Sequence, residues 1–282
     1  MIEATSFGGV PPEYSRADTA KIVIVPVPYD GTSTYMKGAD KGPEAIIRAS
    51  GNMELYDIET DSQVYLQGIF TDDPVDSGPE PEKMVKAVER RVGGHLADGK
   101  FVVLLGGEHS VSIGAVRAHA QKYPGMTVLQ LDAHADLRNE YEGSKYNHAC
   151  VMARVKEMCP IVQVGIRSMD VSEKPTMDRG RVFFAEDIHR GTAGVDTIIR
   201  TLTDPVYITI DLDVFDPSIM PSTGTPEPGG LLWYDVLALL KGVCRRCTVV
   251  GFDVVEMCPL AGHWAPDFMA AKLIYKLLSY RF

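Results

Sequence analysis

Six side chains of types that bind hard metal ions follow apolar runs typical of β-strands. They comprise two imidazoles and four carboxylates, namely His109, Asp132, His134, Asp136, Asp211 and Asp213. Because alternate residues of an extended strand share one face, we expect the Asp-x-His-x-Asp run and the Asp-x-Asp pair each to converge on one point. Six ligands exceed the need of one ion, and a set rich in oxygen with some imidazole suits Mn²⁺ better than a zinc site built from thiolates.

A simpler interpretation is that each aspartate is a turn residue at a strand end, where Asp is common. This explanation suffices for a single residue. It does not suffice for the whole set, since burying so many like charges without a cation would cost many kcal/mol. The residue types and their spacing therefore predict a metal centre.

Short apolar runs alternate with helix-like segments along the chain. The predicted strands are continuous and rich in Val and Ile, as parallel strands buried on both faces are, and they span residues 21–28, 101–105, 127–131, 161–165, 181–184, 206–210 and 248–255. Helices are expected at residues 43–49, 80–96, 110–121, 148–158, 195–202, 231–241 and 266–278. This alternation predicts an α/β fold with a parallel sheet, and all the candidate ligands follow strand C-termini, where such sheets place active sites. We find no repeat or linker that divides the chain, so we expect a single domain over residues 1–282.

Composition narrows the class of protein. The 282-residue chain has a formal net charge of −10 and a pI of about 5.2, so we expect no nucleic-acid partner. We find no signal peptide and no apolar run long enough to cross a bilayer, which predicts a cytoplasmic protein without a membrane partner. Five scattered cysteines do not form a disulfide framework. Cys244 and Cys247 have CxxC spacing but no second pair to complete a zinc site, so we interpret them as part of a helix-to-strand connection.

Several motifs in the same order resemble those of the ureohydrolases, the family of arginases and agmatinases. They are Gly106-Gly-Glu-His109-Ser110, Asp132-Ala-His-Ala-Asp136, Asp211-Leu-Asp-Val-Phe-Asp216-Pro217, Gly224-Thr-Pro-Glu-Pro-Gly-Gly230 and Asp253-Val-Val-Glu256-Met-Cys-Pro259. The opening segments Pro28-Tyr-Asp-Gly-Thr and Lys41-Gly-Pro-Glu-Ala-Ile46 also fit, so the similarity covers nearly the whole chain. The long form Asp-Ala-His-Ala-Asp-Leu-Arg, followed by Asn147-His-Ala-Cys150, is most similar to bacterial and archaeal agmatinases. One departure is Ser222, where the family usually has Gly; a positive φ there would strain the turn mildly.

The resemblance implies an arginase-like, three-layer αβα fold and two Mn²⁺ ions per subunit. His109 and Asp136 would bind one ion, His134 and Asp213 the other, and Asp132 and Asp211 would bridge both. Bound divalent cations lower the pKa of water enough for it to attack the resonance-stabilised guanidinium carbon at neutral pH. Asp136 would help to hold the tetrahedral intermediate. Relatives are commonly trimers or hexamers, so a homo-oligomer is expected.

Two further residues receive catalytic roles. His148 is the candidate proton shuttle to the leaving amine, because imidazole transfers protons near pH 7. Glu256 is the candidate that binds the guanidinium, since a carboxylate accepts two parallel N–H bonds from that planar group. A strand-end glutamate on the surface is the simpler alternative for Glu256, but its place in the motif after an apolar strand favours the site.

The expected substrate is a small cationic guanidino compound, and agmatine is favoured, with putrescine and urea as products. The Ser-Gly-Asn cluster by which arginases bind their amino acid is replaced by Glu140-Tyr-Glu-Gly-Ser-Lys-Tyr-Asn147, which makes arginine less favoured. Glu140 and Glu142 could attract a terminal ammonium, whereas Arg138 and Lys145 would suit a carboxylate such as that of guanidinobutyrate. N1-aminopropylagmatine is a third option. A zinc-dependent acetylpolyamine deacetylase, which uses a tandem His-His pair, and a non-catalytic metal-binding homologue are less favoured alternatives.

The remaining histidines and Glu108 receive structural interpretations. His95 and His119 lie on helix-like segments away from strand ends, and we expect both to be solvated. His189 and His263 lie in loops, where contact with substrate is possible but not favoured. Glu108 could support its neighbour His109, but we expect it to face the opposite side of the chain.

Overall fold

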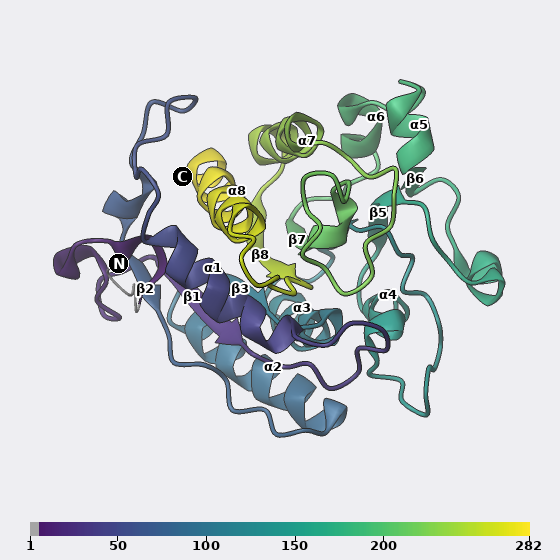
Figure 1. Ribbon diagram of the computed structural model, residues 1–282, viewed down its shortest axis with the longest axis horizontal. Helices are drawn as coiled ribbons and strands as arrows, with labels where there is room; N and C mark the ends of the chain where they lie inside the picture. The colour runs from purple at the N-terminus through teal and green to yellow at the C-terminus, as the bar shows by residue number, and fades with distance from the viewer. Residues whose placement is uncertain (1–5) are drawn as a thin grey trace.

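The computed structural model describes residues 6–282, which form one parallel sheet between two layers of helices (Figure 1). The strands are β1 (Ile22–Val27), β2 (Ile69–Thr71), β3 (Phe101–Gly106), β4 (Thr127–Leu131), β5 (Ile161–Ile166), β6 (Val182–Phe184), β7 (Val206–Asp211) and β8 (Val249–Val255). The helices are α1 (Gly42–Ser50), α2 (Pro81–Ala97), α3 (Ser112–Lys122), α4 (Val151–Val155), α5 (Ala185–His189), α6 (Val195–Ile199), α7 (Trp233–Arg246) and α8 (Ala265–Arg281). The three-layer α/β prediction is confirmed.

The order of the strands brings distant segments of the chain together. The sheet runs β2-β1-β3-β8-β7-β4-β5-β6, and every neighbouring pair is parallel. Its centre is therefore β3-β8-β7-β4, four strands that come from separate parts of the sequence. These are the strands that the candidate ligands and Glu256 follow, so their C-terminal ends meet at one edge.

Both faces of the sheet are buried because the strands are apolar at nearly every position. Side chains such as Ile22 and Val103 face a core completed by α1, α6, α7 and α8. Alternate residues, such as Val23 and Val102, face a second core completed by α2, α3 and α4. This is the arrangement that continuous Val-rich and Ile-rich strands require, because neither face can be left in water.

Two elements are absent from the sequence prediction. Strand β2 is only three residues long and pairs with β1 at the edge of the sheet. Helix α5 is a single turn of five residues directly after β6. Segments this short carry too few residues to display a period, so hydrophobic patterning does not detect them.

The prediction that His95 and His119 are solvated is wrong. His119 is fully buried on the inner face of α3, where its Nδ1 lies 2.8 Å from the Ala115 carbonyl oxygen and its ring packs on Tyr207. His95 is partly buried on α2, with Nε2 2.7 Å from Asp72 Oδ2. Both histidines lie on amphipathic helices. Which side of each helix is buried depends on its contacts with other elements of the fold. Between residues 6 and 282 the structure contains no helix that is both apolar and long enough to cross a membrane.

Candidate metal centre

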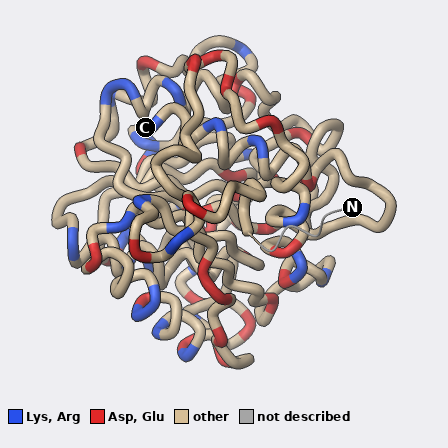
Figure 2. Tube along the Cα trace, turned by 90° about the vertical axis from the view of Figure 1, so that its left-hand side faces the viewer, with Lys and Arg blue, Asp and Glu red and all other residues tan. Residues whose placement is uncertain are grey.

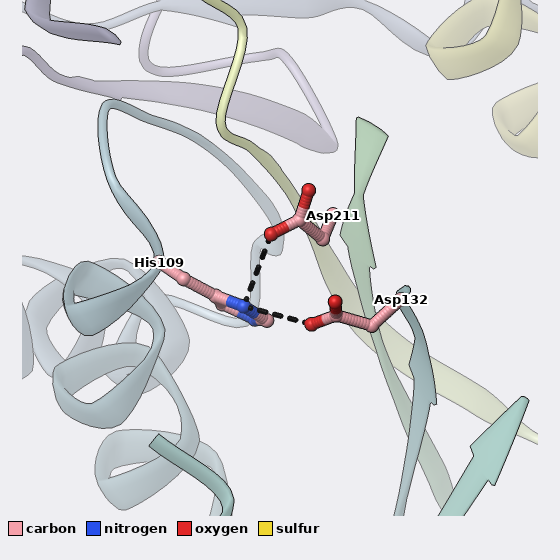
Figure 3. Close-up of side chains that lie close together, drawn as sticks. All are labelled: His109, Asp132 and Asp211. Carbon is pink, nitrogen blue, oxygen red and sulfur yellow. Dashed lines mark ion pairs between the residues drawn. The ribbon is translucent and has the colours of Figure 1, made fainter. Parts of the chain in front are cut away.

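His109 lies at the centre of a cluster of three carboxylates. It begins a 3-10 turn (His109–Val111) between β3 and α3, and its Nδ1 lies 3.1 Å from Asp132 Oδ2, 3.1 Å from Asp136 Oδ2 and 3.4 Å from Asp211 Oδ2. Figure 3 shows Asp132 and Asp211 pointing toward the imidazole from the ends of neighbouring strands. His109 and the three aspartates are almost completely buried, so the atoms face one another and not bulk solvent.

A second cluster shares Asp132 with the first. His134 Nδ1 lies 2.8 Å from Asp213 Oδ2 and 3.7 Å from Asp132 Oδ1. Asp132 therefore directs one carboxylate oxygen to each group, His109-Asp132-Asp211 and Asp132-His134-Asp213. All six predicted ligands are brought together, and Asp132 would be able to contact cations held by either group.

The aspartates converge for reasons other than the extended conformation that we expected. Asp136 has a φ of 53°, in the left-handed region that favours glycine, so the chain turns sharply there. Asp213 lies in a 3-10 turn (Leu212–Val214), and its backbone N–H donates to Asp211 Oδ1 at 2.9 Å, which caps the start of the turn. Strained backbone of this kind is typical of functional sites, because the surrounding structure must hold it.

The electrostatics of the cluster fit a bound cation. Burial lowers the pKa of His109, but the three aspartates around the ring outweigh burial and raise that pKa well above its usual range. Burial, together with the charge of Asp132, raises the pKa of Asp136 to about 7. Burial and neighbouring carboxylates also raise the pKa of Asp211. Divalent cations supply the positive charge that such a site needs without protonating its ligands.

The chemistry of the donors points the same way. His109 Nε2 contacts Thr209 Oγ1 at 2.9 Å, whereas Nδ1 is buried and has no hydrogen-bond partner among the described residues. A buried ring nitrogen that faces carboxylate oxygens is suited to a metal ion. We conclude that the residues present fit divalent-cation binding.

A row of polar side chains supports the ligands from one level below in the sheet. Gln163, Gln130, Thr209 and Asp253 lie at the same register on β5, β4, β7 and β8. Gln163 donates to Gln130 at 2.6 Å, and Gln130 Nε2 donates to Asp132 Oδ2 at 2.7 Å. Thr209 Oγ1 donates to Asp253 Oδ1 at 2.6 Å and lies against His109. These contacts orient Asp132 and His109. The sequence feature that could have revealed this support is a polar residue inside each of these apolar strands.

One glycine and one arginine explain why the loops that carry the ligands keep their conformation. A side chain at Gly107 would place its Cβ 1.9 Å from the Tyr29 carbonyl oxygen, so only glycine allows the β3 loop to pack there. Arg167 donates to the backbone carbonyls of Asp213 at 2.6 Å and Glu227 at 2.8 Å. The arginine thereby ties the loop after β7 to the end of β5.

A cavity of about 320 Å³ opens beside the cluster. Its wall includes the metal-ligand residues His109, His134, Asp136 and Asp211 together with His148, Glu256, Tyr35, Met36, Arg138, Tyr141, Asp170 and Glu173. The two predicted catalytic residues, His148 and Glu256, therefore line the same space as the ligands.

Glu256 is held in an unusual backbone conformation at the end of β8. Its φ is 64°, and its Oε1 accepts a hydrogen bond of 2.7 Å from the His109 backbone N–H. Burial and the charge of Glu108 raise the pKa of Glu256, so a cation in the cavity would stabilise the ionised form. The surface alternative for Glu256 does not agree with this position.

Glu108 does not face away from the site, which corrects the sequence interpretation. Its side chain is fully buried, and Oε1 accepts a 2.8 Å hydrogen bond from Thr32 Oγ1. Thr32 Oγ1 in turn lies 3.2 Å from His148 Nδ1. Thr32 ends the opening segment Pro28-Tyr-Asp-Gly-Thr32 that resembles the family, but we expected no role for it, and it lies 116 positions from His148.

The other residues singled out in the sequence lie outside this site. His189 is at the end of α5, with Nε2 3.0 Å from the Gly230 carbonyl oxygen, and His263 is exposed. Burial raises the pKa of the free thiols of Cys244, to about 12, and of Cys247. Ser222 is not among the described non-glycine residues with positive φ, so the strain considered for it is not found.

Lys and Arg residues are interspersed with Asp and Glu along the described part of the chain (Figure 2).

Comparisons with known proteins identify the class. A sequence profile of the Arginase family matches residues 20–279. The chain is 40% identical to the N(1)-aminopropylagmatine ureohydrolase of Synechocystis sp., with 94% of this chain and 90% of the relative covered. It is 32% identical to the agmatinase of Pyrococcus horikoshii, with 92% of each chain covered. The solved structure of the agmatine ureohydrolase of Thermoplasma volcanium is 33% identical and superposes with a TM-score of 0.84 over 97% of this chain and 96% of that one.

The protein therefore belongs to the arginase family, the ureohydrolases. It is a hydrolase of the class that acts on guanidino C–N bonds, and the family resemblance inferred from the sequence motifs is confirmed.

Proposed function

We propose that the protein hydrolyses the guanidinium group of an aminoalkylguanidine to urea and a polyamine, using two Mn²⁺ ions. Agmatine, which the sequence favoured, and N1-aminopropylagmatine are the two candidate substrates. The relative from Synechocystis sp. supports the aminopropyl compound, and the relative from Pyrococcus horikoshii supports agmatine. The higher identity to the former leads us to rank N1-aminopropylagmatine first.

The charge of the outer cavity wall is the main observation that supports this class of substrate. The Arg138 guanidinium stacks 4.4 Å above the Tyr141 ring and lies 3.9 Å from Asp170 Oδ2, so it is already engaged by its own neighbours. Asp170 and Glu173 outnumber this one cation. A negatively charged wall favours a substrate whose tail is an amine over arginine or guanidinobutyrate, which carry a carboxylate.

The residues divide the chemistry among them. Bound divalent cations would supply a water of lowered pKa as the nucleophile for the guanidinium carbon. Glu256 would accept two N–H bonds from the guanidinium and hold its carbon beside the cluster. Burial lowers the pKa of His148 to about 4, so the imidazole is neutral at pH 7 and can take up a proton. His148 would then deliver that proton to the departing amine, and Asp136 would stabilise the tetrahedral carbon centre.

The test is urea release after Mn²⁺ loading, measured in parallel on agmatine, N1-aminopropylagmatine, guanidinobutyrate and arginine. A tenfold preference in kcat/KM for either aminoalkylguanidine, about 1.4 kcal/mol in the transition state, would support the proposal. A preference for a carboxylate substrate would refute the charge argument. Metal uptake without urea from any compound would indicate a binding protein, and acetate release from acetylpolyamines would indicate a deacetylase.

The variant Asp170→Asn tests whether this carboxylate recognises the charged tail of the substrate. The Asp170 Oδ1 atom accepts hydrogen bonds from the Ser172 N–H and hydroxyl, and an asparagine retains that oxygen. We expect KM for the aminoalkylguanidines to rise while the value for arginine falls or is unchanged. Equal effects on all four compounds would show that Asp170 does not recognise the tail charge.

We further propose that the enzyme acts in the cytoplasm as a homo-oligomer, a trimer or hexamer. Light scattering of the purified protein tests the oligomeric state, because a single molar mass near that of one chain would contradict it.

A further inference from the structure

The side chain of Thr32 connects two groups that are far apart in the sequence. Its hydroxyl is buried between Glu108, in the loop after β3, and His148, which begins the 3-10 turn His148–Cys150. Thr32 is not among the residues that line the cavity, and it is not one of the predicted metal ligands. Its contacts therefore bear on His148 and not on the substrate or the cations directly.

The direction of each hydrogen bond follows from the donors that surround Glu108. Its carboxyl group is approached by the Ser110 N–H at 2.7 Å, the Ser110 hydroxyl at 2.9 Å and the Thr32 N–H at 3.2 Å. The Thr32 hydroxyl is the fourth, at 2.8 Å. The two backbone N–H groups can only donate, and together with the two hydroxyls they satisfy an ionised carboxylate, so we assign the hydroxyl proton of Thr32 to Glu108.

The hydrogen-bonding capacity that remains at the Thr32 hydroxyl determines which ring nitrogen of His148 carries the proton. A threonine oxygen has one proton and two lone pairs. The proton goes to Glu108, and one lone pair accepts the His148 backbone N–H at 2.9 Å. The other lone pair faces His148 Nδ1 at 3.2 Å, which must therefore carry a hydrogen.

We propose that Thr32, held by Glu108, is a positioning residue that fixes His148 as the Nδ1–H tautomer and leaves Nε2 free to exchange a proton in the cavity. The inference rests on the proposed function, in which His148 transfers a proton to the leaving amine. In this tautomer Nε2 has the lone pair that takes up the proton, and Nδ1–H remains bonded to Thr32 throughout. The opposite tautomer would present an N–H to the cavity and could not accept a proton there.

The rest of the surroundings keep the imidazole in this orientation. The Tyr141 ring packs edge-on against it, with the centroids 6.2 Å apart. Asn147, which is buried, caps the turn by accepting the Ala149 N–H at 3.0 Å. The ring therefore has a packing contact, an anchored backbone and one hydrogen bond that selects the tautomer.

The test compares Thr32→Val with Thr32→Ser, since valine keeps the volume and removes the hydroxyl, whereas serine keeps the hydroxyl. General acid–base catalysis is typically worth 10²–10⁴-fold, so we expect Thr32→Val to lower kcat by about 10- to 100-fold with KM nearly unchanged. Thr32→Ser should recover most of the rate. Thr201→Val, the same exchange at a partly buried position outside the cavity, is the control. Metal content should be the same in all variants.

A second readout does not depend on activity. Nitrogen-15 spectra of histidine-labelled protein, loaded with a diamagnetic divalent cation, report the tautomer of neutral His148, whose signal is identified from its loss in His148→Asn. We expect Nδ1–H in the wild type and in Thr32→Ser, and loss of this preference in Thr32→Val. An Nε2–H signal in the wild type would overturn the proposal, as would a normal kcat for Thr32→Val or an equal loss in Thr32→Ser. If the wild type releases no urea, the proposed function fails, and the spectra still decide the tautomer.

Discussion

The buried imidazole of His119 should make the protein less stable in acid by an amount that can be worked out from its surroundings. The residue is fully buried on α3, and its Nε2 packs so closely on Gly251 that a Cβ there would lie 2.3 Å from it. Nε2 also has no hydrogen-bond partner among the described residues. Burial lowers the pKa of His119 from 6.5 to about 4.

The sign follows from proton linkage. Below pH 6.5 the unfolded chain binds a proton at this histidine and the folded chain does not, so the free energy of unfolding falls as the pH decreases. The loss ends near pH 4, where the folded protein also becomes protonated. One pKa unit corresponds to 1.36 kcal/mol, which gives about 2 kcal/mol between pH 7 and pH 5 and about 3 kcal/mol in total.

The assay is urea-induced unfolding of the wild type and of His119→Leu at pH 7 and pH 5. Groups shared by both proteins, including the metal ligands, contribute equally and cancel in the difference. We expect the variant to lose about 2 kcal/mol less than the wild type over this range, whatever its stability at pH 7. His119→Gln, which also cannot titrate, separates the charge effect from the cavity left by leucine. Parallel losses in all three proteins would refute the reasoning.

Three further predictions concern the site. Asp213→Asn keeps the oxygen that accepts from the Ala133 N–H but removes the carboxylate charge beside His134. Metal titration should therefore show at least about tenfold weaker binding of one cation. Unchanged stoichiometry and affinity would exclude Asp213 as a metal ligand. Glu256→Gln removes two charge-assisted bonds worth about 3 kcal/mol together, so kcat/KM should fall roughly 10²-fold; normal kinetics would place Glu256 outside the site. Thr209→Val should weaken metal binding by about 10- to 100-fold through loss of the contact with His109 Nε2, and normal affinity would show that this support is dispensable.

The sequence by itself determined the chemistry and the class of fold. The ligand types in Asp132-Ala-His-Ala-Asp136 and Asp211-Leu-Asp213 indicated a metal centre, because clustered carboxylates and imidazoles have few other uses at strand ends. The alternation of apolar runs and helical segments determined the parallel sheet, since periodicity and burial are local properties. The missed elements, β2 and α5, were too short to show a period.

Only the tertiary structure decided how these residues meet. The insertion of β8 and β7 between β3 and β4 places His109, Glu256, Asp211 and Asp132 on adjacent strand ends, although they are widely separated in the chain. The left-handed backbone at Asp136 and Glu256 likewise depends on the loops packed around them.

The contacts made by Thr32, Glu108 and His119 also lay beyond the reach of the sequence. A hydroxyl, a carboxylate or an imidazole is equally acceptable on the surface, and no local pattern distinguishes the buried ones. Their roles arise from partners such as His148 and Gly251 that are supplied by distant segments. The chemistry of the side chains can therefore be inferred from the sequence, whereas burial and hydrogen-bond direction are properties of the folded chain.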